Sequence, residues 1–386
     1  MKVFHLLRRA LAVVLIPATL AGCAWLSGGQ PVQPVSPLLS IPNPVSGSVT
    51  WRRDAGDGSE LERLQIATMN GRIFATEEDG VVTAFDARSG ATVWTTDTDA
   101  QITGGVGTGD GLALVGTAEG EVIALDAASG AERWRSALSS EILAAPAAAN
   151  GVAVVRTNDG KVVGLSAADG SRLWTFQREV PVLSLRGTAP PVTVGQHVIC
   201  GMDGGRLVSL EIATGRPAWE VLVAYPTGRS DLSRVVDIDG RPLILGNTVY
   251  VTTFQGELAA VDVDTGTIRW AVPLSSYNGV GAVSGMIFAS DDLGHLKAVD
   301  EASGETVWTQ KALSGRRLSP PAGVGAWVAV ADLEGYLHWV NPATGEIAGR
   351  TRAVDSAVRA PLLVEGGTVF VTGVEGEVAA VQAPSP

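Results

Sequence analysis

A phrase that begins with Gly occurs eight times in this chain, about forty residues apart, and it constrains the fold more than any other feature. Each copy runs through four or five strand-type residues to a polar residue and then through a small turn that ends in Gly, as in Gly120–Trp134. Repeats of this length are supersecondary units that cannot bury their apolar surface alone, so they stack or close into a ring. The other copies begin at Gly80, Gly160, Gly205, Gly256, Gly294, Gly335 and Gly376.

Each repeat has room for four short strands. In the second repeat we expect an inner strand around 103–107, then strands at 111–117, 121–126 and 132–136. The strand after Glu121 is apolar on both faces, which is typical of a sheet covered on both sides, as propeller blades are by their neighbours. No long stretch outside the N-terminal segment has helical periodicity. We therefore predict an all-β fold, an eight-bladed β-propeller of four-stranded antiparallel blades.

The two ends of the repeat array complement each other. The seventh repeat has Gly349 where a Trp is expected, and the eighth stops at 380–382 without an outer strand. Near the start, Val49-Thr50-Trp51 is an outer-strand phrase with no repeat before it. We predict that residues 49–52 complete the last blade, because a ring closed by its own termini leaves no exposed sheet edge. The propeller would then span residues 49–386.

The polar residue, the Gly and the Trp of the repeat are interpreted as structural. Asp126 can accept hydrogen bonds from the backbone N–H groups ahead of it, and Gly130 can adopt a positive φ at little cost. A Trp on the outer strand can pack between adjacent blades. Because these residues recur with the repeat, structure explains them better than ligand binding does. The Trp residues are Trp51, Trp94, Trp134, Trp174, Trp219, Trp270 and Trp308.

The N-terminal 22 residues are predicted to be a signal peptide. Lys2, Arg8 and Arg9 precede an apolar run at 10–20 that is too short to span a bilayer as a stable helix. Leu20-Ala21-Gly22-Cys23 resembles a bacterial lipobox, which implies cleavage before Cys23, acylation (palmitate) of that residue and a lipid-anchored place on the periplasmic face of the outer membrane. The alternative is an ordinary signal peptide with an incidental Cys. Residues 23–48 are rich in Pro and read as an extended tether.

Charge and cysteine content exclude some partners. Removal of residues 1–22 takes away three basic residues and no acidic one, which leaves 25 basic and 40 acidic residues, a net charge of −15. So acidic a surface argues against binding to nucleic acid and against attachment to anionic lipid through clustered basic residues. Once Cys23 is acylated only Cys200 remains, so no disulfide can form within the monomer.

The phrase Ala-Leu-Asp-x-x-Ser/Thr-Gly-x-x-x-Trp resembles the repeat of pyrroloquinoline quinone (PQQ) dehydrogenases across the whole folded region. Two families share this repeat: the quinoprotein enzymes, and the BamB family of lipoproteins in the outer-membrane β-barrel assembly machine. The repeat alone does not separate them, since fold does not settle function.

Two longer connections favour the second family. Spacings between repeat starts are 40, 40, 45, 51, 38, 41 and 41, and the excesses follow Trp174 and Trp219. Both are connections from an outer to an inner strand and so lie on one face, which in repeat proteins is often the binding face. The segments 181–187 (Pro-Val-Leu-Ser-Leu-Arg-Gly) and 231–240 resemble BamB segments, although the second has a longer spacing between Ser233 and Asp237.

This resemblance implies a non-catalytic scaffold for β-barrel protein assembly. It implies docking on the periplasmic POTRA domains of BamA, contact with other subunits of the complex, and contact with unfolded outer-membrane protein clients, for which strand addition at blade edges is one route. The residues of this chain that match the docking segments are Leu183, Leu185, Arg186, Asp237 and Asp239.

In an extended loop Leu183 and Leu185 point the same way and supply an apolar centre, with Arg186 beside them for charge-assisted hydrogen bonds. Asp237 and Asp239 also lie on one side of an extended segment and can pair with Arg186 or with a basic partner group. The structural alternatives are that the leucines belong to a buried inner strand, that Arg186 is only solvated, and that residues 237–240 form a simple hairpin turn.

An enzyme is not expected. The quinoprotein resemblance implies adjacent disulfide-bonded cysteines, a Ca²⁺ site and a catalytic Asp in a longer chain, whereas Cys200 stands alone. His197, His295 and His338 are scattered over different repeats without metal-ligand spacing, and no nucleophile elbow or phosphate-binding loop occurs. We expect no cofactor and no metal. A small PQQ-dependent dehydrogenase and a ligand-sensing propeller remain as alternatives.

Overall fold

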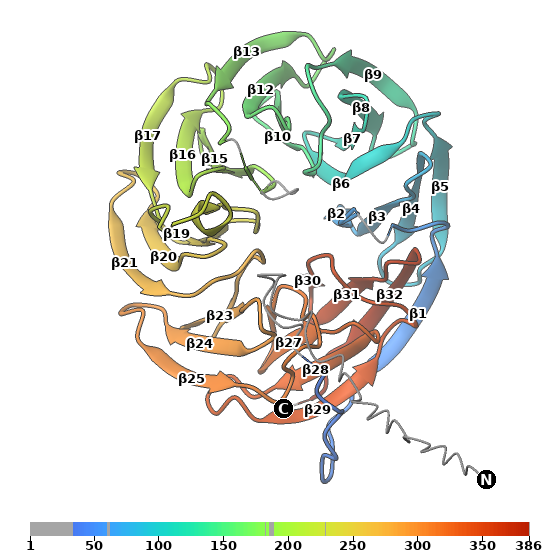
Figure 1. Ribbon diagram of the computed structural model, residues 1–386. Coiled ribbons are helices and arrows are strands. Elements are labelled where there is room, and N and C mark those ends of the chain that lie inside the picture. Colours follow the sequence, from blue (N-terminus) through green and yellow to red (C-terminus); the bar gives the residue numbers. More distant parts are fainter. Residues whose placement is uncertain (1–33, 60–61, 182, 185–188, 228, 386) are drawn as a thin grey trace, which may run out of the picture. The chain divides into compact units, whose positions relative to one another are not determined.

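The protein is described by a computed structural model that covers residues 34–59, 62–181, 183–184, 189–227 and 229–385 (Figure 1). Within these residues, eight four-stranded antiparallel sheets lie side by side as the blades of a ring, as predicted. A single turn of 3-10 helix, η1 (Leu232–Arg234), is the one helical element of the described ranges. No helix in this part of the chain is long and apolar enough to cross a membrane.

Each blade runs from an inner strand beside the central channel to an outer strand at the rim. Their bounds, in blade order, are β2 (Ala67–Met69), β3 (Arg72–Thr76), β4 (Val81–Asp86), β5 (Thr92–Asp97); β6 (Ile102–Gly109), β7 (Leu112–Thr117), β8 (Glu121–Asp126), β9 (Glu132–Ala137); β10 (Ala147–Ala149), β11 (Val152–Arg156), β12 (Lys161–Ser166), β13 (Arg172–Gln177); β14 (Val192–Val194), β15 (His197–Met202), β16 (Arg206–Glu211), β17 (Pro217–Leu222); β18 (Leu243–Leu245), β19 (Thr248–Thr252), β20 (Glu257–Asp262), β21 (Ile268–Pro273); β22 (Gly281–Val283), β23 (Met286–Ser290), β24 (Leu296–Asp300), β25 (Thr306–Gln310); β26 (Ala322–Val324), β27 (Trp327–Ala331), β28 (Tyr336–Val340), β29 (Ile347–Arg352); and β30 (Leu363–Glu365), β31 (Thr368–Thr372), β32 (Glu377–Gln382), β1 (Ser48–Asp54).

The N-terminal strand closes the ring. β1 pairs antiparallel with β32 as the outer strand of the eighth blade, and Trp51 lies opposite Ala380 (Figure 1). The Trp51 side chain is buried against Phe85 of the first blade and Phe370 of the eighth. The prediction that the two termini share a blade is therefore confirmed. Its physical basis is that pairing removes the free edge of β32.

Trp residues connect seven of the eight blade interfaces in the same way. Each outer-strand indole N–H donates to a carbonyl oxygen in the turn of the next blade, over 2.8–3.2 Å. The Gly of that turn has φ between +68° and +77°, and a Cβ there would come within 2.7 Å of the indole. The turn therefore needs Gly for its conformation and for its contact with the ring. The pairs are Trp51 with Gly90, Trp94 with Gly130, Trp134 with Gly170, Trp174 with Gly215, Trp219 with Gly266, Trp270 with Gly304, and Trp308 with Gly345.

The Asp residues of the turns also act locally. Asp126 Oδ1 accepts hydrogen bonds from Ala128 N and from Ser129 N and Oγ, and Arg133 pairs with the other oxygen at 2.6 Å. Arg133 and then Ser129 lower the pKa of Asp126 to about 2. The carboxylate is thus held in its charged form by its own turn, which agrees with a structural role.

The seventh blade departs from this pattern. Its outer strand carries Gly349, and the Trp stands instead on the neighbouring strand as Trp339, directly opposite in the register. The N-terminal residues 45–47 occupy the space beside them: Val45 N donates to Ala348 O at 3.0 Å, and Gly47 N donates to Thr351 Oγ1 at 2.8 Å. A Cβ on Gly349 would lie 1.8 Å from the Val45 carbonyl oxygen, so only Gly fits.

The segment before β1 is attached to the propeller from Ser36 onward, which the Pro-rich composition did not indicate. Ser36 N donates to Ser314 O at 3.0 Å, and its carbonyl accepts from the buried Arg316 at 2.9 Å. Ile41 packs against the core of blades six and seven. Residues 1–33, which include the predicted signal peptide, Cys23 and the first part of the tether, lie outside the described residues.

Candidate docking face

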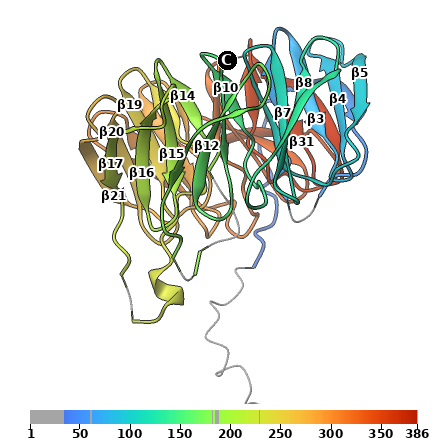
Figure 2. The same ribbon diagram turned by 90° about the horizontal axis from the view of Figure 1, so that it is seen from above.

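The two longest predicted connections leave the same end of neighbouring blades. Residues 178–191 join β13 to β14, and residues 223–242 join β17 to β18. Because each connects an outer to an inner strand, both lie on one face of the ring. Figure 2 shows the second connection, with η1 near its tip, extending well beyond the body of the propeller.

The roots of both connections share one hydrophobic core. Ala189 from the first connection, and Val223 and Ile238 from the second, are almost fully buried and pack in one cluster with β15 and β19. Pro181 is the side chain nearest to Gly204 in the β15–β16 turn, and Asp237 of the second connection contacts the same glycine. The two connections are therefore positioned by the same blade.

Of the first docking segment the structure describes Leu183 and Ser184, and Leu183 is 46% exposed. It lies outside the inner strand β14, so the alternative that it belongs to a buried inner strand does not apply. Leu185 and Arg186 lie outside the described residues. Their predicted role as partner contacts stays a prediction.

Asp237 is buried, with 1% of its surface exposed. Its Oδ1 accepts a hydrogen bond from Gly204 N at 2.9 Å, and its carbonyl oxygen accepts one from Phe254 N at 2.9 Å. Buried carboxylates need such partners, and these two bonds tie the loop to two different blades. This geometry favours a structural role for Asp237 over the expectation that its carboxylate meets a partner. Whether Asp237 also contacts a partner stays a prediction.

Asp239 lies nearby, and neither of its side-chain oxygens is exposed or hydrogen-bonded within the described residues. Burial, and then the charge of Asp237, raise its pKa to about 8, although Arg156 opposes the shift. The protonated form of Asp239 is therefore favoured more than that of an ordinary Asp. Asp237 and Asp239 differ in hydrogen bonding as well as in position, which the two-residue spacing did not indicate.

Two further polar residues join this cluster, and the sequence reading did not single them out. Arg156 at the end of β11 is 1% exposed and pairs with Asp203 at 2.9 Å, while its Nε and Nη1 have no hydrogen-bond partner in the described chain. The one feature of the sequence that pointed to Arg156 was its place at the end of an otherwise apolar strand. The cluster joins blades three and four to the second connection, and thus supports the root of that connection.

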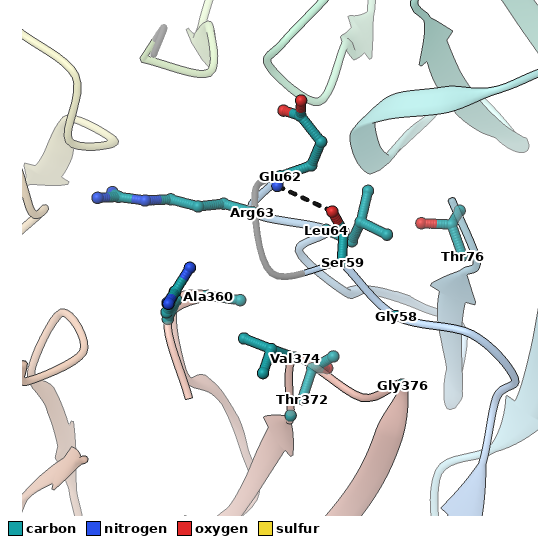
Figure 3. A pocket seen from close by; sticks show the side chains of 12 residues that line it. Gly58, Ser59, Glu62, Arg63, Leu64, Thr76, Ala360, Thr372, Val374 and Gly376 are labelled. Carbon is teal, nitrogen blue, oxygen red and sulfur yellow. Dashed lines mark hydrogen bonds between the residues drawn. The ribbon is translucent and has the colours of Figure 1, made fainter. Parts of the chain in front are cut away.

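The connection between blades eight and one forms a small pocket of about 20 Å³, lined by Ser59, Thr76 and Thr372 among others (Figure 3). The Thr76 and Thr372 hydroxyls are buried and have no hydrogen-bond partner among the residues that the structure describes. This volume holds about one water molecule. In Figure 3 the Arg63 side chain extends away from these hydroxyls; its guanidinium lies 5.0 Å from the ring centroid of Tyr277.

A wider cavity of about 520 Å³ lies in the central channel. It is lined by residues of the inner strands β14, β18, β22, β26 and β30 and by residues just before these strands, mostly Val, Leu, Ile, Pro and Gly. Within the described residues, no group of three or more His, Cys, Asp or Glu side chains is placed to hold a metal ion. His197, His295 and His338 stand in different blades.

Fold and repeat together define a PQQ-type β-propeller. The family model of the outer membrane protein assembly factor BamB matches residues 78–310 and 292–385. A relative from Alkalilimnicola ehrlichii, named outer membrane protein assembly factor BamB, is 45% identical over 377 residues, which cover 97% of each chain. The chain belongs to the BamB family.

Two solved structures place this family among propellers. The crystal structure of BamB from Moraxella catarrhalis is similar with a TM-score of 0.81 and 29% identity, over 87% of this chain and all of that one. A quinohemoprotein alcohol dehydrogenase from Comamonas testosteroni is similar with a TM-score of 0.67 at 15% identity, over 88% of this chain and 77% of that one. The second likeness shows the fold alone.

Proposed function

We propose that this protein is a non-catalytic scaffold of the machinery that assembles β-barrel proteins in the outer membrane. Membership of the BamB family supports this role, because the relatives bear the name of an outer membrane protein assembly factor. In this proposal the loop-bearing face docks on the POTRA domains of BamA, and Cys23 carries the lipid that anchors the protein on the periplasmic face of the outer membrane.

The observation that carries the docking proposal is the exposed Leu183 on a loop whose root is buried. Burial of Ala189 and Ile238 fixes the roots of the connections, while Leu183 is left 46% exposed, and Val180 of the same connection is 36% exposed. Apolar side chains on a supported loop are suited to form the centre of a small interface, with Arg186 as a polar neighbour. Specific interfaces depend on a few such residues.

The test is a binding assay between the full-length protein and a POTRA fragment of BamA. We expect Leu183→Ala/Leu185→Ala, and separately Arg186→Ala, to weaken binding at least about tenfold each. Leu173→Ala is a matched control, because Leu173 is 50% exposed but lies on the outer strand β13. Wild-type affinity of folded Leu183 and Arg186 variants would remove this docking surface.

The non-catalytic and lipid-anchored parts of the proposal have separate tests. Purification in the presence of Ca²⁺ and added PQQ, followed by absorbance spectroscopy and mass spectrometry, is expected to show no stoichiometric quinone; retained quinone would favour the dehydrogenase alternative. Mass spectrometry of the mature N-terminus is expected to find an acylated Cys23. A Cys23→Ser variant is expected to leave the membrane fraction.

A further inference from the structure

The cavity in the central channel combines an apolar wall with a single cation. Its volume of about 520 Å³ falls within the range of small-molecule sites, roughly 300–1,000 Å³. Arg241 is the one charged residue among the described residues that line it, and none of the described docking residues, Leu183, Asp237 and Asp239, does so. An apolar cavity with very few polar groups is typical of a site for a small ligand.

The inner strands make the wall of the channel apolar. Seven of the eight consist only of apolar residues, Gly and Thr. The exception is β30, whose last residue, Glu365, accepts a hydrogen bond from Thr68 Oγ1 at 2.7 Å. Leu243, Ile244 and Val364 line the cavity and are only half-buried, although they also pack against the blade cores. An apolar ligand in the channel therefore removes apolar surface from water.

Arg241 stands just before β18, at the end of the cavity nearest the loop-bearing face. Its side chain is accessible to solvent, yet burial lowers its pKa, because water in the channel reaches a guanidinium that protein surrounds. Within the described ranges it has neither a hydrogen bond nor an ion pair, and no acidic side chain offsets the effect of burial on its pKa. A cation without a counter-charge in such surroundings attracts an anion.

Two connections meet at the same end of the channel. Arg63, between blades eight and one, donates from Nη1 to the Tyr277 carbonyl oxygen at 3.4 Å, and its guanidinium lies 5.0 Å from the Tyr277 ring centroid. Tyr277 belongs to the connection between blades five and six, on another side of the ring (Figure 1). The contact partly covers the loop-bearing end of the channel. The inner strands lead away from Arg241 toward the opposite face.

We infer that the central channel binds an aliphatic monocarboxylate, a medium-chain fatty acid, with its carboxylate on Arg241 and its chain along the inner strands. The planar guanidinium presents parallel N–H groups that match the two oxygens of a carboxylate. A phosphate monoester carries close to two negative charges, and one Arg leaves part of that charge uncompensated beside an apolar wall. The inference does not depend on the proposed function.

An aliphatic chain fits this wall better than an extended peptide does. Each of the five inner strands that line the cavity is three residues long. None of them therefore offers the run of N–H and C=O groups that pairing with a further strand needs. A peptide brings amide groups that need hydrogen-bond partners in the channel, whereas a hydrocarbon chain has none.

The test is a calorimetric titration of the full-length protein with decanoate, decanol, acetate and acetyl-trileucine. A Cys23→Ser background removes the predicted acylation site, so that neither a covalent acyl chain nor detergent competes. We expect decanoate to bind and acetate not to bind. Arg241→Met is expected to weaken decanoate binding at least about tenfold and to leave decanol binding unchanged, because only the carboxylate makes charge-assisted hydrogen bonds.

Two further variants control this result. Arg172→Met is the matched control, since Arg172 is exposed on the outer strand β13. Arg241→Lys keeps the charge but loses the two parallel donors, so we expect an affinity for decanoate between those of the wild type and Arg241→Met. The Lys variant also tests the site if Arg241→Met does not fold.

Photolabelling locates the ligand. A decanoate analogue with a diazirine at the end of its chain is expected to label residues 192–194, 243–245 and 280–282, which line the cavity. Equal affinity of the wild type and both Arg241 variants for decanoate, labelling confined to the exposed loops, or tighter binding of acetyl-trileucine than of decanoate would each overturn the inference. Binding of Arg241→Met to the POTRA fragment is expected to be unchanged, so the channel site and the docking face are tested separately.

Discussion

The seven blade interfaces that use a Trp and the one that does not solve the same packing problem in two ways. In the seven, an outer-strand Trp lies opposite a small residue, such as Ala124 opposite Trp134 or Gly164 opposite Trp174. In the seventh blade the sizes are exchanged, with Trp339 opposite Gly349. Residues 45–47 then fill the space at the rim that the other blades give to an indole.

The exchange shows that where one copy of the repeat lacks its Trp, another segment of the chain can occupy the space. Trp339 is fully buried, its indole N–H donates to Thr351 Oγ1 at 3.0 Å, and Gly47 packs against its ring. The regular interfaces depend on residues about forty positions apart, whereas this one joins residues about three hundred apart. Local repetition builds the first kind, and only closure of the ring brings the second together.

The largest expected effect is on a regular interface. Trp174→Ala removes a 9%-exposed indole that packs on Gly164 and Gly215, and we expect a loss of about 3–5 kcal/mol in the free energy of unfolding. Trp174→Phe keeps a ring but leaves the Ile212 carbonyl without its donor, for a loss of about 1–2 kcal/mol. Chemical denaturation measures both. Equal stability of the two variants would show that the packing of the indole contributes little.

A second variant tests how Arg316, between blades six and seven, holds the N-terminal segment. This buried guanidinium pairs with Asp332 at 2.7 Å and with Glu334, and it holds the Ser36 carbonyl. Arg316→Met leaves Asp332 without that partner, and we expect a loss of about 3 kcal/mol. Faster hydrogen exchange at residues 36–45 is expected with it. Unchanged exchange there would show that the N-terminal segment is held without Arg316.

The third variant tests whether a Trp at position 349 can restore the regular packing in the seventh blade. Gly349→Trp restores the repeat in sequence, but its Cβ would meet the Val45 carbonyl oxygen, so we expect a loss of about 2 kcal/mol and release of residues 45–47. The double variant Trp339→Ala/Gly349→Trp reproduces the size pattern of the other blades. It is expected to recover part of the loss while residues 45–47 stay exchangeable. A stabilised single variant would contradict this explanation of Gly349.

The smallest expected effect is a pH dependence in the seventh blade, at the buried Asp332. Burial alone raises the pKa of Asp332, but the His338 hydrogen bond and charge, followed by Arg316, hold that pKa below its ordinary value of 3.8. The stabilisation is therefore present above about pH 4 and is lost as the pH falls through the pKa of the folded state. The difference in unfolding midpoint between wild type and Asp332→Asn should shrink from pH 7 to pH 3. A constant difference would contradict this assignment.

Much of the fold was predictable because the repeat reports local chemistry. The strand after Glu121 was placed at 121–126 and is found as β8 over the same residues, since apolar side chains on both faces require cover on both sides. Trp51 was predicted to close the ring because it was an outer-strand phrase without a repeat. The candidate site was predicted less well. The expanded loops were identified by length, but the burial of Asp237 and the place of Arg241 in the channel were not.

The sequence by itself determined the number of blades, the order of their strands, the closing strand and the location of the two expanded connections. Each of these follows from spacing and from side-chain size within one repeat. The tertiary structure decided which side chains of the connections are buried and why Gly349 replaces a Trp. Both depend on contacts between distant segments, such as Asp237 with Gly204 and Val45 with Gly349, which the periodicity of a chain does not encode.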